Sequence, residues 1–437
     1  MQLQNRVRNA FGKTDTPENT VRRITDGFQR LGYEIGYTPF AVADRIHWAQ
    51  IGIGAIGLQC QGKGMTPELA QASAHAELAE RFSGGLFYQA FEEQVRFNMP
   101  ALYSRQVDRF LNYEWLPGYV HAHQNDLQED HLAIEALLAN QPHLRAADIA
   151  KIKDTRMASH WVDGYSLIQA KTVKVPISFI AYINASNGMA AGNTLEEAVI
   201  QAACEVFERY TQIQIIKPEK SVPTIDRETV PDGGLRSMMA FFEKHNVEVV
   251  LKDLSLEGRF PSIGALFINH NLRPGILEHK ILVPGVSFNM NEALSRCLTE
   301  FMQGRSTLKA PSPGLDKPVS PHHARVENLY LLFKCCISQK DIGFLEQGAT
   351  VAYRDLRSKD ILAEIEAIKE ICRTLETDFI VLDLTHPVLQ FPVVRVIVPG
   401  ISDFLPFVYR DILTMPETSP DAAWRGEPFK RVMETFF

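Results

Sequence analysis

Two stretches of this chain repeat each other: GMTPELAQASAHAELAERF at Gly64–Phe82 and GNTLEEAVIQAACEVFERY at Gly192–Tyr210. They align at a constant offset of 128 residues, and eight of the nineteen aligned positions are identical. Each copy opens with a Gly-x-Thr turn, whose threonine is suited to cap a helix, and closes with the motif E-x-x-E-R. The repeat predicts two equivalent helices, Pro67–Phe82 and Leu195–Gln212, in an internally duplicated fold.

A weaker third copy, NEALSRCLTEF at Asn291–Phe301, aligns with the second copy at an offset of 95 residues. In this copy Arg296 takes the place of Gln201, and Glu300 takes the place of Glu205. The third copy predicts a further helix at Glu292–Met302.

On each of the first two helices the polar side chains of the repeat fall on one narrow stripe, at 100° per residue. These side chains are Ser73, Glu77 and Glu80 in the first copy and Glu197, Gln201, Glu205 and Glu208 in the second. Alanine and apolar residues flank both stripes, so we expect the carboxylates to be partly buried, where unpaired charge is costly. Mg²⁺ with a bound nucleotide would balance them, because Mg²⁺ prefers carboxylate and phosphate oxygens and arginine suits phosphate. The helix amino termini at Thr66 and Thr194 would add anion-binding groups.

A plainer interpretation is that these helices carry solvated ion pairs. Glu77 with Arg81 and Glu205 with Arg209 have the i, i+4 spacing of ordinary surface pairs, which contribute ~0.3–0.5 kcal/mol. For one copy alone this would be the simpler explanation, but a solvated face does not require the same carboxylate spacing twice. The motif G-x-x-x-x-G-K-[ST] does not occur, so no P-loop explains the nucleotide. Lys63, in a short GKG turn, is a weaker candidate for a phosphate contact.

The three helix motifs together resemble the ATP-binding motifs of the YcaO superfamily. They read S-x-x-x-E-x-x-E-R at Ser73–Arg81, E-x-x-x-Q-x-x-x-E-x-x-E-R at Glu197–Arg209 and R-x-x-x-E at Arg296–Glu300. The likeness continues at Ser186–Thr194 and at Val394–Asp403. It implies a YcaO-type α+β (mixed α/β) fold with mixed sheets and internally repeated ATP-site helices.

The resemblance also implies ATP and Mg²⁺ as cofactors and assigns residues to them. The implied metal ligands are Glu77, Glu80, Glu197, Glu205, Glu208 and Glu300. The implied nucleotide-binding residues are Lys13, Thr20, Ser73, Arg81, Asn193, Thr194, Glu197, Gln201, Arg209, Arg296 and Glu300. Arg296 and Glu300 are in addition the implied catalytic residues. Ala190 departs from the pattern, because the second motif of the family usually has serine there.

The chemistry implied is ATP-dependent activation of a peptide backbone amide. A nucleophile adds to the amide carbon, and the resulting oxyanion takes the γ-phosphoryl group, so that the oxygen leaves as phosphate. A neighbouring Cys, Ser or Thr gives an azoline, sulfide a thioamide and an amine an amidine. Azoline-forming members typically end in a proline-rich tail, whereas this chain ends WRGEPFKRVMETFF. We therefore expect a non-azoline reaction such as thioamidation, or assistance to ribosomal-protein methylthiolation.

The partners expected from the resemblance are a peptide or ribosomal-protein substrate, a sulfur-delivery or methylthiotransferase partner, and a second copy in a homodimer. The alternative function is a nucleotide-binding accessory or scaffold protein without amide chemistry of its own. Cys204 and Cys297 lie on the site helices, but we expect them to be packing residues and not sulfur carriers.

Composition is that of an ordinary globular protein of 437 residues, with 52 acidic and 45 basic side chains and a formal charge of −7. This balance favours neither nucleic acid nor an anionic membrane as a partner. The longest apolar stretches, such as Ile51–Leu58, are too short to span a bilayer. The polar amino terminus has no secretory pattern, so we expect a cytoplasmic location.

We expect a single YcaO unit with subdomains: residues 1–125 with the first E-x-x-E-R helix, a polar connector at 126–165, a central part at 166–305, a Pro/Ser-rich loop at 306–325 and a carboxyl-terminal part at 326–437. Runs rich in β-branched residues predict the strands. The expected strands are Ala49–Cys60, Ser166–Ile183, Val247–Leu254, Ile263–Asn269, Ile281–Phe288, Phe379–Leu384 and Val393–Val398. Further expected helices are Thr20–Leu31, Leu235–His245 and Asp360–Leu375.

Overall fold

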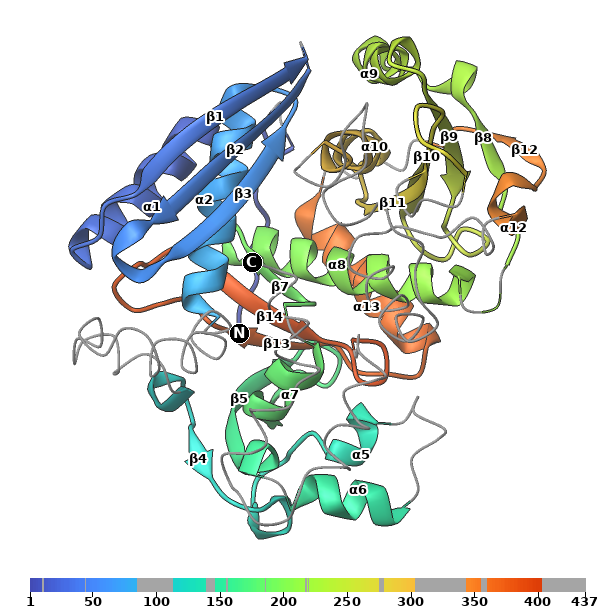
Figure 1. The fold of residues 1–437 in the computed structure, drawn as a ribbon. Helices are drawn as coiled ribbons and strands as arrows, with labels where there is room; N and C mark the ends of the chain where they lie inside the picture. Colours follow the sequence, from blue (N-terminus) through green and yellow to red (C-terminus); the bar gives the residue numbers. More distant parts are fainter. Residues whose placement is uncertain are drawn as a thin grey trace.

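The computed structural model describes residues 1–402, with gaps at 10–11, 44, 85–112, 139–145, 155, 185, 217, 219, 275–278, 303–342 and 355–359. In this part of the chain three β-sheets lie around one long helix, α8 (Leu195–Ile216) (Figure 1). The other helices are α1 (Pro17–Arg30), α2 (Pro67–Ser83), α5 (Ile134–Leu137), α6 (Ala146–Lys153), α7 (Ile177–Asn184), α9 (Gly233–Lys244), α10 (Met290–Glu300), α12 (Gly343–Glu346) and α13 (Ile361–Thr374).

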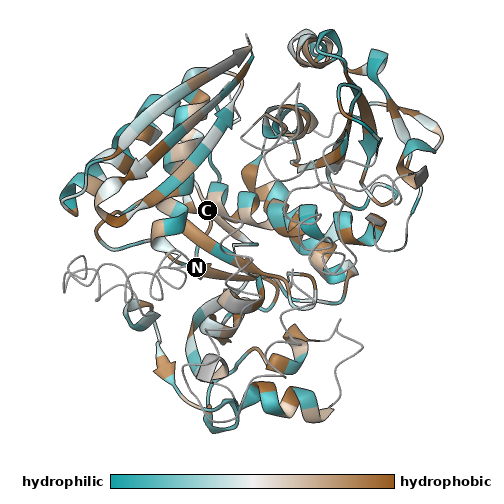
Figure 2. Cartoon of the chain, in the orientation of Figure 1, coloured by the Kyte–Doolittle hydropathy of each residue, from teal (hydrophilic) through white to brown (hydrophobic). Residues whose placement is uncertain are grey.

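The first sheet is an antiparallel meander of three strands, β1 (Gly36–Ala43), β2 (Ile46–Ile53) and β3 (Leu58–Gly64). Hydrophobic and hydrophilic residues alternate along β2 and β3 (Figure 2). One face packs on α1 and α2, where Phe28 and Leu78 are fully buried. The sheet therefore fixes α2, the first of the repeated helices.

The second sheet has the strand order β4-β5-β13-β14-β7, with β6 paired to β5, and every pair is antiparallel. Its strands are β4 (Val120–His121), β5 (His160–Ser166), β6 (Lys171–Pro176), β7 (Met189–Ala191), β13 (Ile380–Asp383) and β14 (Val393–Ile397). Ile134 and Ile152, from the segment expected as a polar connector, are buried in the core of this sheet. The expected division of the chain into subdomains stays a prediction.

The third sheet has the order β11-β10-β9-β8-β12. Its strands are β8 (Thr224–Asp226), β9 (Val247–Asp253), β10 (Ser262–Asn269), β11 (Lys280–Val286) and β12 (Thr350–Ala352). β12 runs parallel to β8, and the other pairs are antiparallel. Side chains of α8, α9, α10 and α13 form one continuous core with this sheet. The α+β class is confirmed, but mixed pairing is limited to this sheet among the described strands.

Two expected strands were wrong in extent. Ala49–Cys60 is not one strand but parts of β2 and β3, which are separated by a single 3₁₀ turn that closes at Gly57 with φ +67°. Ser166–Ile183 comprises the end of β5, a turn, β6 and then α7. A continuous apolar run does not distinguish a buried helix from a buried strand, because both faces of either element are covered.

The other expected helices and strands are present, with ends within four residues of those predicted. Among the described residues, no helix is long and apolar enough to cross a bilayer. The Pro/Ser-rich segment 306–325 and the carboxyl-terminal segment WRGEPFKRVMETFF lie outside the described residues.

Candidate functional site

Each of the three sheets contributes one strand–turn–helix unit to the site. The units are β3 with α2, β7 with α8 and β11 with α10. A side chain caps each helix at its amino terminus. The Thr66 hydroxyl accepts a hydrogen bond from the Leu69 N–H, and the Thr194 hydroxyl accepts one from the Glu197 N–H. The Asn289 side chain accepts hydrogen bonds from the N–H groups of Asn291 and Glu292. The offsets of 128 and 95 residues relate these three caps. The sequence repeat is therefore a repeat of a supersecondary unit.

Small residues let each strand lie directly against its helix. A Cβ added at Gly62 on β3 would come within 2.0 Å of the Ala74 nitrogen on α2. A Cβ added at Gly285 on β11 would come within 2.5 Å of the Ala293 carbonyl oxygen on α10. Such close packing holds the helix at a defined height above the sheet and so sets where its polar stripe points.

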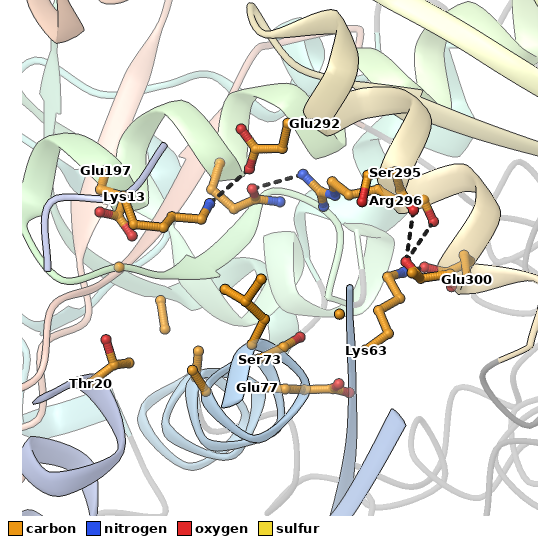
Figure 3. Close-up of a pocket in the computed structure, with 18 of the residues that line it drawn as sticks. Lys13, Thr20, Lys63, Ser73, Glu77, Glu197, Glu292, Ser295, Arg296 and Glu300 are labelled. Atoms are coloured by element: carbon orange, nitrogen blue, oxygen red, sulfur yellow. Dashed lines mark hydrogen bonds and ion pairs between the residues drawn. The ribbon is translucent and has the colours of Figure 1, made fainter. Parts of the chain in front are cut away.

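The three helices meet around one cavity of about 570 Å³ (Figure 3). The structure places every implied site residue except Thr194 in its lining: Lys13, Thr20, Ser73, Glu77, Glu80, Arg81, Asn193, Glu197, Gln201, Glu205, Glu208, Arg209, Arg296 and Glu300. Thr194 supports the site indirectly, because its hydroxyl caps α8 at 3.3 Å from the Glu197 nitrogen. Ala190 is buried in β7, where it pairs with Val394.

Four carboxylates and two arginines from α2 and α8 form one end of the cavity, which we call the carboxylate end. Its members are Glu77, Glu80, Arg81, Glu205, Glu208 and Arg209. Arg81 lies 3.4 Å from Glu80 and 3.5 Å from Glu77, and Arg209 lies 3.5 Å from Glu208. Burial first, and then the neighbouring carboxylates, raise the pKa values of Glu80 and Glu205. The carboxylates at this end are therefore partly buried, and the positive charge of Arg81 and Arg209 does not offset their burial and mutual repulsion. This disfavours a role as ordinary solvated ion pairs.

The opposite end, which we call the Lys13 end, is lined by Lys13, Glu197 and Glu292, and Thr14 lies behind it, bonded to Glu197. Lys13 Nζ lies 2.9 Å from Glu292 Oε1, as the dashed line in Figure 3 marks. The backbone N–H and the hydroxyl of Thr14 donate to Glu197 Oε2 at 2.9 and 2.7 Å. Burial would raise the pKa of Glu292, but Lys13 and Arg296 outweigh it and hold that pKa below its usual value.

Thr20 of α1 and Arg296 of α10 close the sides of the cavity. The Thr20 hydroxyl donates to Asn193 Oδ1 at 2.7 Å, and both side chains are buried. Arg296 donates to Gln201 Oε1 at 2.8 Å, which joins α10 to α8.

Glu300 forms an ion pair with Lys63 of β3. Lys63, a weak candidate from the sequence, thus links the first unit to the third across the cavity.

Sequence reasoning missed Glu292, although a signal for it existed. At the offset of 95 residues Glu292 is the counterpart of Glu197, as Arg296 is of Gln201. It also missed Arg395 of β14, a fully buried side chain whose charge acts on Glu80 and Glu205. Burial lowers the pKa of Arg395 to about 10. No local pattern marks Arg395, because only the antiparallel pairing of β14 with β7 brings it under the site.

The donor set fits Mg²⁺ and a nucleotide. Nine carboxylates and five cationic side chains line the cavity, a formal charge of −4. Among the described residues no three His, Cys, Asp or Glu side chains already converge as a metal-binding group, and Arg81 and Arg209 lie beside the carboxylates. A hard divalent cation satisfies carboxylate oxygens, and the freed arginines suit phosphate. The raised pKa values of Glu80 and Glu205 reflect the negative charge that such a cation would neutralise.

Residues 61–402 match the family model described as YcaO cyclodehydratase, ATP- and Mg²⁺-binding. The chain belongs to the YcaO family. ATP and Mg²⁺ are the cofactors of this family, as the sequence motifs implied. The three-sheet α+β architecture is that of a YcaO structure from Methanopyrus kandleri bound with AMPPCP and Mg²⁺, which matches with a TM-score of 0.60 and 20% identity over 95% of this chain and 99% of that one.

Two curated relatives are similar to this chain in sequence. The ribosomal protein S12 methylthiotransferase accessory factor YcaO of Escherichia coli is 26% identical over 411 residues, 90% of this chain. An uncharacterized protein of Haemophilus influenzae is 28% identical over 363 residues, 80% of this chain. The chain spans 66% and 58% of the lengths of these two relatives.

Proposed function

We propose that the chain is an ATP- and Mg²⁺-dependent enzyme that activates a backbone amide of a peptide or protein by O-phosphorylation. The observation that supports this function is the meeting of three repeated helices, one from each sheet, around a single cavity lined with carboxylates and arginines. Phosphoryl transfer depends mainly on positioning and charge neutralisation, and these side chains supply both.

In this proposal each end of the cavity has its own task. Mg²⁺ would be held by Glu77, Glu80, Glu205 and Glu208, with Glu197 and Glu300 adding metal or nucleotide contacts. Arg81, Arg209 and Arg296 would neutralise phosphate oxygens, and Lys13, Thr20, Ser73, Asn193 and Gln201 would orient the nucleotide. Bound ATP supplies the phosphoryl group that turns the amide oxygen into a leaving group.

The nucleophile is proposed to come from outside the described part of the chain, which favours thioamidation or assistance to ribosomal-protein methylthiolation. Cys60, Cys204, Cys297 and Cys372 are buried. Burial raises the pKa values of the Cys60, Cys204 and Cys372 thiols, so it disfavours their reactive thiolate forms. A separate sulfur-delivery or methylthiotransferase partner would then supply the sulfur. The name of the Escherichia coli relative motivates the ribosomal-protein alternative.

The test of the site is Mg²⁺-dependent nucleotide binding and ATP turnover of wild type and Glu205→Ala. We expect Glu205→Ala to weaken nucleotide binding in the presence of Mg²⁺ by about 100-fold, the upper range for loss of a group that supports a metal site. The matched control is Glu370→Ala, which removes an exposed carboxylate of α13 that pairs with Arg373. Nucleotide binding that is unchanged in Glu205→Ala would contradict the site assignment.

The alternative function is a nucleotide-binding accessory or scaffold protein without amide chemistry. Intact-mass spectrometry of candidate peptides and ribosomal proteins, after incubation with ATP and sulfide, separates the two functions. The enzyme predicts the mass increase of an oxygen-to-sulfur exchange that disappears in Glu205→Ala. Nucleotide binding without any mass change in a cellular extract would favour the scaffold. A homodimer and a cytoplasmic location stay predictions from the sequence.

A further inference from the structure

Residues 1–9 and 12–16, which we call the N-terminal strap, lead from the surface of the molecule to the cavity. The Gln4 N–H donates to Glu196 Oε1 at 2.7 Å, and Arg6 pairs with the other oxygen of the same carboxylate at 3.4 Å. Further along, Thr14 bonds Glu197, the next residue of α8, and Lys13 bonds Glu292 of α10. The strap therefore runs beside the amino-terminal turn of α8 and ends in the Lys13 end of the cavity.

A bidentate ion pair holds the middle of the strap. Both terminal nitrogens of Arg8 donate to the two oxygens of Glu364 at 2.5 Å. Glu364 is 1% exposed and lies on the buried face of α13, next to Ile361, Ile365 and Ile368. A carboxylate on that face gains little stability from pairing, because loss of hydration offsets the attraction. What the planar, two-bond contact does provide is a defined position for the Arg8 backbone.

Short local contacts carry that position from Arg8 to Lys13. The Asn9 N–H donates to the Lys13 carbonyl at 2.7 Å, and the Lys13 N–H donates to Asn9 Oδ1 at 3.1 Å. The Asn9 amide also donates to the Asp15 carbonyl at 2.7 Å. Asn9, which adjoins Arg8, is thus bonded directly to Lys13, which lines the cavity, and to Asp15 beyond it.

We propose that Arg8 and Glu364 are a positioning pair, which sets the N-terminal strap so that Lys13 meets the nucleotide and Thr14 holds Glu197 in place. The proposal rests on the proposed nucleotide site, because its effect is on two residues that line that site: Lys13, and Glu197, which Thr14 bonds. Neither Arg8 nor Glu364 lines the cavity, so the pair acts through Lys13 and Thr14. It makes α13, an element far along the chain, a determinant of nucleotide affinity.

The experiment compares Arg8→Ala, Glu364→Gln and the double variant in the full chain, with the nucleotide and Mg²⁺ as the probe. We expect each single variant to bind about tenfold more weakly and the double variant to bind no more weakly than either, because both remove one interaction. The KM for ATP should rise while kcat at saturating ATP stays near that of wild type, and Arg8→Lys should recover part of the affinity. Glu370→Ala, on the exposed face of the same helix, is the matched control.

A second measurement follows the strap directly. Hydrogen exchange of residues 3–16 and chemical acylation of the Lys13 amine should both speed up in Arg8→Ala and in Glu364→Gln, with or without nucleotide. Faster exchange with nucleotide affinity within about twofold of wild type would overturn the positioning role, since it falls below the coupling of linked sites. Unchanged exchange and acylation would overturn the anchoring itself. Failure of the proposed function is distinguishable. If the amide chemistry is absent, nucleotide affinities still test the pair, and if wild type binds no nucleotide, the exchange and acylation rates still test the anchoring.

Discussion

Glu197 and Glu292, at the Lys13 end of the cavity, accept hydrogen bonds of 2.7–2.9 Å from Thr14 and Lys13, whereas the nearest arginine nitrogens at the carboxylate end lie 3.4–3.5 Å from Glu77, Glu80 and Glu208. The pKa of Glu292 is lowered, and those of Glu80 and Glu205 are raised. Helix α8 contributes to both ends, and Glu197 and Glu205 are about 12 Å apart along it at the rise of a helix.

The difference teaches that the same motif serves two purposes, depending on the neighbours that the fold supplies. At the Lys13 end the N-terminal strap provides a cation and donors, so the carboxylates are satisfied within the chain. At the carboxylate end the arginines do not offset burial and mutual repulsion. Carboxylates that are paired within the chain, as at the Lys13 end, are suited to position a ligand. Carboxylates with surplus negative charge, as at the carboxylate end, favour an added cation.

The largest effect is expected at the carboxylate end. Glu80→Gln should weaken nucleotide binding in the presence of Mg²⁺ by about 100-fold, because a metal-ligand oxygen is lost. The same substitution should not lower the free energy of unfolding measured without Mg²⁺ at neutral pH, since it removes a carboxylate whose charge is unfavourable there. Isothermal titration and urea unfolding measure the two quantities. A variant that loses stability and binding together would mean that Glu80 is a structural residue.

The pH dependence of stability should separate the two ends by sign. A raised pKa in the folded state means that folded Glu80 holds its proton more strongly than unfolded Glu80. The stability of wild type relative to Glu80→Gln should therefore fall by roughly 2 kcal/mol as pH rises from about 5 to about 8. Urea unfolding across this range, without Mg²⁺, measures the change. Parallel curves for the two proteins would show that Glu80 keeps an ordinary pKa.

A smaller effect is expected at the Lys13 end, where loss of a carboxylate should lower the free energy of unfolding. Glu292→Gln should reduce the free energy of unfolding by about 1–2 kcal/mol at neutral pH, a value below that of a fully buried pair because Lys13 is 35% exposed. Because the pKa of Glu292 is lowered in the folded state, this difference should shrink as pH falls through that pKa. Thermal unfolding at neutral and acidic pH tests both statements. Glu248→Gln, an exposed carboxylate beside His270, is the control.

Much of the site was predictable because its signals are local. The caps Thr66 and Thr194, the helical spacing of the glutamates and the closing arginines all lie within one helix, where periodicity shows which residues share a face. The hairpin of β2 and β3 was not predicted as two strands, since the turn at Gly54–Gly57 is short and lies inside one apolar run. Arg8 and Arg395 carry no local pattern, so their place near the site depended on contacts distant in sequence.

The sequence by itself determined three helices with capped amino termini and carboxylate stripes, and through the repeat it determined that these helices are equivalent. The tertiary structure decided that each helix belongs to a different sheet, that all three face one cavity, and which carboxylates obtain a cation from the strap. The physical reason is that helix formation depends on neighbours within a turn or two, whereas the energy of a charge depends on burial and on partners brought close by packing. Arg8 and Glu364, 356 residues apart in the chain and 2.5 Å apart in the fold, are the clearest instance.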